Sequence, residues 1–311
     1  MLPCPKVMDG RRAVVRSARR GSSQRLKEPL EHLYRSFDYR GRVDRDAIRF
    51  PLRYSDPIDR EVVGLLAACL AYGRVEVFSR ALDRVLAAMG PSPAAFVREF
   101  RIERDAVRFD DFLYRLNRPR DLVGLCLALQ QILAKHGSLE SFFLAGHAAS
   151  HPDVGPALER FSRGFLEADF GRVFPGGTLS RGYRHLFPLP STGGPCKRLN
   201  LFLRWMVRRE PPDFGLWRRV SPAKLLIPLD THIENMSRAV GLTRRKTRDW
   251  RMATAITRRL ASLDPHDPVK YDFSLCHKRM SGDCLGRRDV VICRPCGLRS
   301  VCLRWRGVSR A

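Results

Sequence analysis

Residues 187–197, FPLPSTGGPCK, make a turn that leads directly into a helix. Prolines and two adjacent glycines interrupt any regular element before Lys197. The stretch closes a Gly- and Pro-rich segment that begins at Gly171, and a helical spacing of apolar residues runs from Pro195 to about Arg209. The sequence therefore predicts an irregular segment followed by a helix whose first turn contains Lys197.

Helical spacing of apolar residues extends over most of the chain on both sides of this turn. Gly73 and Gly90 follow two of the helical segments and Asp56-Pro57 opens another, as is common at helix ends. Strand-like alternation is almost absent, so we predict an all-α fold. The helices are expected at residues 26–36, 58–72, 75–89, 119–136, 138–147, 155–168 and 246–263.

The chain is strongly basic, with 57 Lys and Arg against 32 Asp and Glu in 311 residues, a formal net charge of +25. This excess favours a polyanionic partner, and the charge alone does not distinguish DNA, RNA and an anionic membrane surface. No run of about 18 apolar residues indicates a membrane span, and the Arg-rich start lacks the apolar segment of a signal peptide. We therefore expect a soluble cytoplasmic protein, without a membrane partner, and a monomer.

Composition divides the chain into three parts. Residues 1–25 contain many arginines and few large apolar residues, which is typical of a solvated basic arm. Residues 26–275 carry the helical patterns and should form one domain. Residues 276–311 hold five of the nine cysteines and form a basic, cysteine-rich tail.

Lys197 is a candidate nucleophile. In the first turn of a helix the macrodipole disfavours a cation and favours the neutral amine, which is the form that attacks carbon. The alternative is a solvated lysine beside Arg198 on a basic face.

Gly193 and Gly194 place backbone N–H groups, without side chains, just before the helix, where a nucleic-acid phosphate can approach. An ordinary tight turn is the alternative interpretation of the two glycines.

Asp230 is the candidate partner of Lys197. It precedes Thr231-His232-Ile233-Glu234, a capping-box pattern in which Thr231 is the N-cap and Glu234 reaches back. In that arrangement the cap does not need Asp230, whose carboxylate is free for another task. The alternative makes Asp230 itself the N-cap, with Thr231 one residue inside the helix.

Four cysteines of the tail have the spacing C-x8-C-x2-C-x5-C, in which four thiolates can close on one metal or cluster: Cys284, Cys293, Cys296 and Cys302. Cys276 is a competing ligand for the first position. Spacing does not distinguish an iron–sulfur cluster from zinc. Cys69 and Cys126 lie in apolar runs and should belong to the core.

The residues now carry a resemblance. Residues 189–197, LPSTGGPCK, and 228–233, PLDTHI, resemble the hairpin lysine and the V-D-T-H aspartate of the helix-hairpin-helix (HhH-GPD) superfamily of endonuclease III and the 8-oxoguanine glycosylases. The hairpin is about two residues longer than usual. The separation of Lys197 and Asp230 is longer than in endonuclease III and similar to that of an archaeal 8-oxoguanine glycosylase branch. Residues 65–74 and 270–273 also resemble an uncharacterised bacterial family of this superfamily.

The resemblance implies a two-lobed helical glycosylase fold with a C-terminal loop that holds a [4Fe–4S] cluster, with zinc as the alternative. It implies a base-excision repair enzyme, associated with the nucleoid, that acts on double-stranded DNA with a damaged base such as the oxidised purine 8-oxoguanine. Lys197 would attack the anomeric carbon of the sugar and form a Schiff base that permits β-elimination, and Asp230 would take the lysine proton and stabilise the cationic sugar. The flipped nucleotide needs a pocket and an inserted side chain. The residues expected to contact DNA are Gly193, Gly194, Arg74 and Arg198.

Two other classes of function remain open at the level of sequence. A non-catalytic nucleic-acid-binding protein with a structural metal would have the same charge and the same cysteines. An RNA-processing protein would share the basic surface but prefer RNA.

Overall fold

The computed structural model describes residues 24–306, so the basic arm expected at residues 1–25 lies almost wholly outside the described residues. The described part is built from helices and contains no strand, apart from an isolated bridge between Tyr114 and Asn117. The all-α prediction is therefore confirmed for this part of the chain. No helix within residues 24–306 is both long and apolar enough to cross a membrane.

The first described helix runs through residues 24–36. The later helices are α2 Arg40–Val43, α3 Pro57–Leu70, α4 Val75–Met89, α5 Pro93–Arg98, α6 Ile102–Asp105, α7 Pro119–His136, α8 Leu139–Leu144, α9 Gly155–Leu166, α10 Arg181–Leu186, α11 Lys197–Val207, α12 Thr231–Ala239, α13 Trp250–Ala261, α14 Asp272–Met280, α15 Val290–Cys293 and α16 Leu303–Arg306. Short 3-10 turns occur at Ala47–Arg49, Pro51–Arg53, Ala106–Phe109, Pro175–Gly177, Pro190–Thr192 and Pro222–Lys224.

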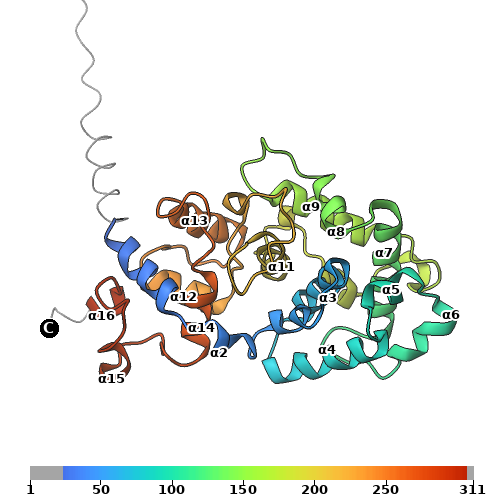
Figure 1. The fold of residues 1–311 in the computed structure, drawn as a ribbon, viewed down its shortest axis with the longest axis horizontal. Helices are drawn as coiled ribbons and strands as arrows, with labels where there is room; N and C mark the ends of the chain where they lie inside the picture. The colour runs from blue at the N-terminus through green and yellow to red at the C-terminus, as the bar shows by residue number, and fades with distance from the viewer. Residues whose placement is uncertain (1–23, 307–311) are drawn as a thin grey trace, which may run out of the picture.

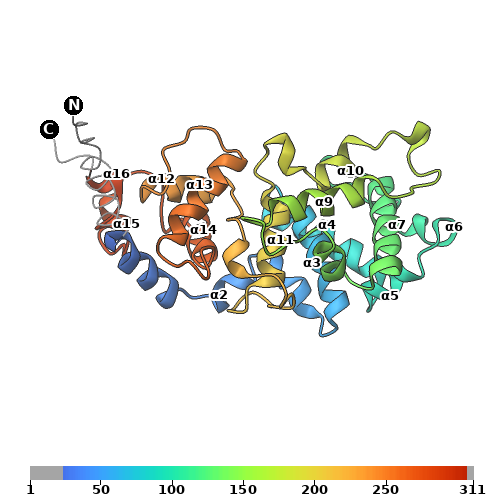
Figure 2. The same ribbon diagram turned by 90° about the horizontal axis from the view of Figure 1, so that it is seen from above.

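The helices form an elongated molecule with two ends (Figures 1 and 2). Helices α4 to α10 gather at one end, and α12 to α16 gather at the other together with the helix of residues 24–36. The described start and finish of the chain thus lie at the same end. Helices α3 and α11 occupy the middle, so α11 connects the two groups.

The core of the middle region is the contact between α3 and α11. Nearly every residue of both helices is buried, including Val62–Leu70 and Leu199–Val207. Gly64 allows the close approach, because a Cβ atom there would lie 2.7 Å from the methyl carbon of Met206. A helix buried on all sides fixes the orientation of its first residue, which in α11 is Lys197.

Arg204 of α11 and Arg208, the residue that follows this helix, are buried in an ion-pair network. Arg204 pairs with Asp213 (Nε to Oδ1, 3.1 Å) and with Asp272, and Arg208 pairs with Asp213 and with Asp267 (Nε to Oδ2, 2.9 Å). Buried charges need such partners, because an unpaired charge away from water is costly. The network joins α11 to the start of α14.

The predicted helices are confirmed, with shifts of a few residues at their ends. The expected helix at 246–263 begins at Trp250 because the Asp249 side chain accepts a hydrogen bond from the Met252 amide and caps it. Within the segment expected to be irregular, Ser180 caps the short helix α10. Helix α14 is not among the helices predicted from the sequence, and it contributes one wall of the pocket that contains Lys197.

Candidate functional site

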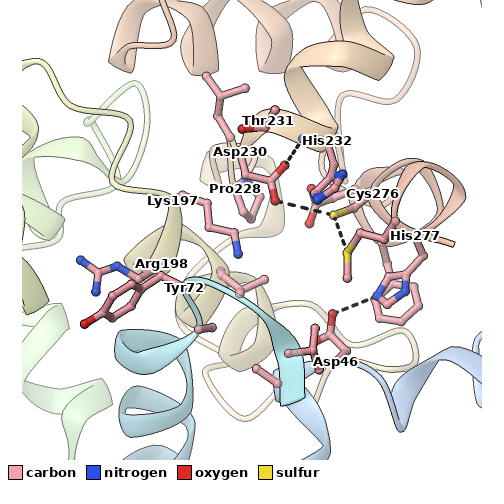
Figure 3. Close-up of a pocket in the computed structure, with 18 of the residues that line it drawn as sticks. Asp46, Tyr72, Lys197, Arg198, Pro228, Asp230, Thr231, His232, Cys276 and His277 are labelled. Atoms are coloured by element: carbon pink, nitrogen blue, oxygen red, sulfur yellow. Dashed lines mark hydrogen bonds and ion pairs between the residues drawn. The ribbon is translucent and has the colours of Figure 1, made fainter. Parts of the chain in front are cut away.

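A pocket of about 480 Å³ lies where the first residues of α11 and α12 and one face of α14 meet the end of α3. Both candidate catalytic residues, Lys197 and Asp230, line it. Figure 3 shows the lysine side chain extending into this space, with Asp230 on one side. The structure thus brings together two residues that are far apart along the chain.

Lys197 is the first residue of α11 and is half-buried. The preceding Cys196 has φ of 46°, a left-handed conformation that is rare for a residue with a side chain. Its buried thiol lies 3.5 Å from the carbonyl oxygen of Gly194. Within residues 24–306 the Lys197 amine makes no hydrogen bond or ion pair, so it is available to a molecule in the pocket.

The turn before α11 is exposed at Gly193. Gly193 has φ of 82°, a conformation that favours glycine, and a Cβ atom there would meet no atom within 4 Å. The prediction that the Gly193 amide is free is wrong, because this N–H donates to the Pro190 carbonyl (2.9 Å). The Gly194 N–H, in contrast, has no backbone partner among the described residues. The Gly193 carbonyl accepts from the Trp250 amide (2.8 Å), which ties the turn to α13.

Asp230, and not Thr231, is the N-cap of α12. Its Oδ1 accepts hydrogen bonds from the amides of His232 (2.8 Å) and Ile233 (2.9 Å), so the predicted Thr231–Glu234 capping box is wrong. An aspartate at this position can satisfy two of the free amides of the first turn. The cap uses one oxygen only. The other oxygen, Oδ2, lies 3.8 Å from the thiol of Cys276 on the pocket side.

Helix α14 supplies the residues of the site that the sequence analysis did not assign: Asp272, Phe273, Cys276, His277 and Met280. Their spacing of three and four residues places them on one side of the helix. The helix is anchored at its start, because Asp272 pairs with Arg204. A signal was present in the sequence, since apolar and polar residues from 272 to 280 follow a helical spacing that went unassigned.

Asp272 is a second carboxylate in the pocket. It is 2% exposed, and its Oδ1 has no hydrogen-bond partner among the described residues. Burial raises the pKa of Asp272 to about 6, with Arg204 opposing the rise and the neighbouring Asp230 adding to it. A buried acceptor without a donor is uncommon in folded proteins.

Cys276 lies in this pocket, apart from the other cysteines of the tail. Its thiol contacts Asp230 Oδ2 and lies 3.6 Å from the sulfur of Met280. Burial, reinforced by the negative charge of Asp230, raises the pKa of the thiol well above its ordinary value. Cys276 is therefore a neutral thiol that can donate a weak hydrogen bond to Asp230.

A histidine and an aspartate pair on another wall of the pocket. His277 Nε2 lies 2.9 Å from Asp46 Oδ2, and the imidazole stacks on Phe273 with ring centres 4.1 Å apart and an angle of 23°. Burial raises the pKa of the Asp46 carboxyl group, whereas the hydrogen bond with His277 lowers it. The net effect is a lowered pKa. The pair connects α14 to the segment that precedes α3.

Arg198 and Arg74 differ sharply in position. Arg198, expected to contact DNA, is buried, so the alternative interpretation of a basic face that includes Arg198 is wrong. Its guanidinium donates to the carbonyl oxygens of Cys69 (2.6 Å) and His185, which lie near helix ends and lack helical donors. Arg74 follows Gly73 of the pocket, and its side chain is 85% exposed. Arg74 therefore lies at the surface beside the pocket.

Residues 46–281 match the model of a family described as "Protein of unknown function (DUF2400)". The chain belongs to this family. The matched region contains Lys197, Asp230 and all of α14, and it ends before Cys284. No curated protein matches the chain, and no solved structure matches it.

The four cysteines of the predicted metal site lie beyond the region matched to the DUF2400 family. All four are free of disulfides and line a second, small pocket of about 30 Å³, whereas Cys276 does not line it. A four-thiol donor set suits a cluster or zinc. In the described part of the chain, however, no three potential ligands lie close enough together to hold a single metal ion.

Proposed function

We propose that this member of the DUF2400 family is a DNA glycosylase with abasic-site lyase activity, built on a two-lobed HhH-GPD arrangement. The observation that carries the proposal is the unengaged amine of Lys197 in the same pocket as the Asp230 carboxylate. An amine nucleophile beside a carboxylate is the minimum that Schiff-base chemistry at a sugar requires. The pocket would receive a nucleotide turned out of double-stranded DNA.

In the first step the neutral amine of Lys197 attacks the anomeric carbon, C1′, of the sugar. The bond from C1′ to the base breaks, and the base leaves with its electron pair. Asp230 takes a proton from the attacking nitrogen through Oδ2, the oxygen that the helix cap does not use. The bond between C1′ and the ring oxygen then breaks with its electrons on the oxygen, which takes a proton from water, and the nitrogen lone pair forms a protonated imine between C1′ and Lys197.

The chemistry of the pocket suits a damaged purine, and we propose an oxidised purine such as 8-oxoguanine. The space of about 480 Å³ accommodates a purine with its sugar. Tyr72 and Phe273 present aromatic rings to the pocket, and aromatic faces stack on bases.

A turn beside the pocket carries apolar side chains that would fill the space left by the flipped nucleotide. Leu113 and Leu116 are 66% and 37% exposed, although both are large and apolar. The turn is held in place because the Tyr114 hydroxyl donates to the Tyr72 carbonyl and the Tyr72 hydroxyl donates to Asn117 (2.6 Å). We propose that this turn, more than Arg74, enters the duplex.

Positive and neutral donors around the pocket would hold the DNA backbone. Arg45 and Arg248 line the pocket, Arg74 lies beside it, and the Gly194 amide has no backbone partner among the described residues. The four thiols of the tail, which the structure does not bring close enough together to hold one metal ion, would have to draw together around a [4Fe–4S] cluster or zinc, and the bound group would then shape the surrounding arginine-rich loop as a further DNA contact. No chemical step depends on that group.

The test is borohydride trapping of the purified protein on duplexes that contain 8-oxoguanine or an abasic site. The parent should form a covalent complex, and Lys197→Gln should form none while it still binds DNA. Lys246→Gln is the matched control, because Lys246 is an exposed lysine outside the pocket and the charge change is the same. Base release by Lys197→Gln would overturn the mechanism. Absence of trapping by the parent on both duplexes would favour a non-catalytic nucleic-acid-binding protein.

A further inference from the structure

The second half of the proposed reaction needs a base that the residues assigned so far do not supply. After the imine forms, a proton must leave C2′ of the sugar before the strand can break. The Lys197 nitrogen is then part of a protonated imine, an iminium, and has no lone pair to offer. Asp230 has one oxygen committed to the helix cap, and its other oxygen has taken the proton of the first step.

We infer that His277, oriented by Asp46, is the base that removes the C2′ proton and so promotes cleavage of the strand. This inference rests on the proposed function, because it concerns the fate of the same imine. His277 and Asp46 both line the pocket that contains Lys197 and Asp230. Figure 3 shows the Lys197 amine extending into the pocket with Asp230 on one side and the Asp46–His277 pair on another.

The contacts of His277 hold the imidazole in one orientation. The ring is stacked on Phe273, and Nε2 lies 2.9 Å from Asp46 Oδ2. Asp46 is fixed in turn, because its Oδ1 accepts from the Ile48 amide (3.0 Å). A residue whose partner is itself held by the backbone has little freedom to rotate, which is the property that a catalytic base requires.

The hydrogen bond to Asp46 also assigns the chemistry of the two ring nitrogens. A carboxylate accepts, so Nε2 carries the hydrogen and Nδ1 keeps the lone pair in the neutral ring. Within residues 24–306, Nδ1 of His277 makes no hydrogen bond. The lone pair of Nδ1 is therefore free to accept a proton, and the Asp46 carboxylate stabilises the imidazolium that results.

The step balances as follows. Nδ1 of His277 takes the C2′ proton, the electrons of the C2′–H bond form a C1′–C2′ double bond, and the iminium nitrogen recovers its lone pair. That lone pair then restores the iminium, the double bond moves to C2′–C3′, and the C3′–O bond breaks with its electrons on the 3′-phosphate. The proton on the imidazole passes to water. No oxidant, reductant or metal is consumed.

The experiment separates imine formation from strand cleavage on an abasic duplex. In His277→Gln, borohydride trapping should stay within twofold of the parent, while strand cleavage without borohydride should slow by about 100-fold or more. Deuterium at C2′ should slow cleavage by the parent, and added imidazole should restore cleavage by His277→Ala. The isotope effect would show that removal of the C2′ proton limits cleavage, and the rescue by imidazole would not occur if His277 had only a structural role.

His147→Gln is the matched control, because His147 also stacks on a phenylalanine, Phe143, but does not line the pocket. Asp46→Asn gives a second measurement: it keeps a hydrogen-bond acceptor for the ring and loses the charge, so cleavage should slow while trapping persists. Equal cleavage by His277→Gln and the parent, with equal trapping, would overturn this inference and leave the proposed function intact. Failure of the parent to trap on the abasic duplex would overturn both.

Discussion

Removal of the Asp213 carboxylate should destabilise the fold by about 3–5 kcal/mol. The side chains of Asp213, Arg204 and Arg208 are at most 2% exposed, and Asp213 contacts both guanidinium groups. A hydrogen bond to a charged group contributes about 1.5–3 kcal/mol, and loss of one partner from a buried ion pair costs about 3–5 kcal/mol. Compensation is limited, because Nη2 of each arginine already has no partner among the described residues.

The assay is urea unfolding of Asp213→Ala and the parent, followed by the fluorescence of the buried Trp205 and Trp217. Asp83→Ala is the matched control, because Asp83 pairs with Arg53 at 2.8 Å but both side chains are 46% exposed. An exposed pair contributes about 0–1 kcal/mol, so the control should change the free energy of unfolding very little. A loss of less than 1 kcal/mol in Asp213→Ala, or equal losses in the two variants, would refute the reasoning.

The other predictions concern pH and metal. Burial, with the charge of Arg198, lowers the pKa of His185 from 6.5 to about 4. As the pH decreases, His185 of the unfolded chain is protonated near pH 6.5 and His185 of the folded protein only near pH 4, so the free energy of unfolding falls over this range. The pKa difference corresponds to ~3 kcal/mol, and screening of the half-buried ring reduces the loss to about 1–2 kcal/mol. In urea unfolding at pH 7 and 4.5, the free energy of unfolding of His185→Asn should fall by about 1–2 kcal/mol less than that of the parent. Equal falls in the two proteins would contradict this. Cys293→Ser should lower the iron or zinc content of the purified protein relative to the buried-cysteine control Cys126→Ser, and equal metal contents would contradict the four-cysteine assignment.

Local signals were sufficient to predict most of the helices. The long helices α3, α4, α7 and α11 bury continuous apolar faces, so their spacing was visible without knowledge of their partners. The turn before Lys197 was also predictable, because prolines and glycines restrict the backbone by themselves. Their positions at helix starts make Lys197 and Asp230 candidates with open alternatives, and it is the resemblance to the hairpin lysine and the aspartate of the HhH-GPD superfamily that pairs them; the structure places both in one pocket.

The residues that complete the pocket depend on contacts between distant segments. Asp46 and His277 meet only because α14 packs against the segment before α3, and neither residue carries a local pattern that indicates a pair. The burial of Arg198 depends likewise on the carbonyl of Cys69, which α3 brings close. The choice between Asp230 and Thr231 as the N-cap was open because both residue types cap helices well.

Helix α12 connects the two groups of candidate residues in this protein. Asp230 caps the start of α12 at the large pocket. The small pocket of the four cysteines is lined by two residues near the end of the helix, Met236 and Ala239, and by Val240, which follows it. Arg304 of the tail also donates to the Asn235 side chain (3.3 Å). Because α12 is a rigid element of nine residues, about 13 Å long, packing of the cysteine loop against its end restrains the carboxylate at its start. The loop beyond the matched family region therefore supports the position of Asp230 without entering the pocket.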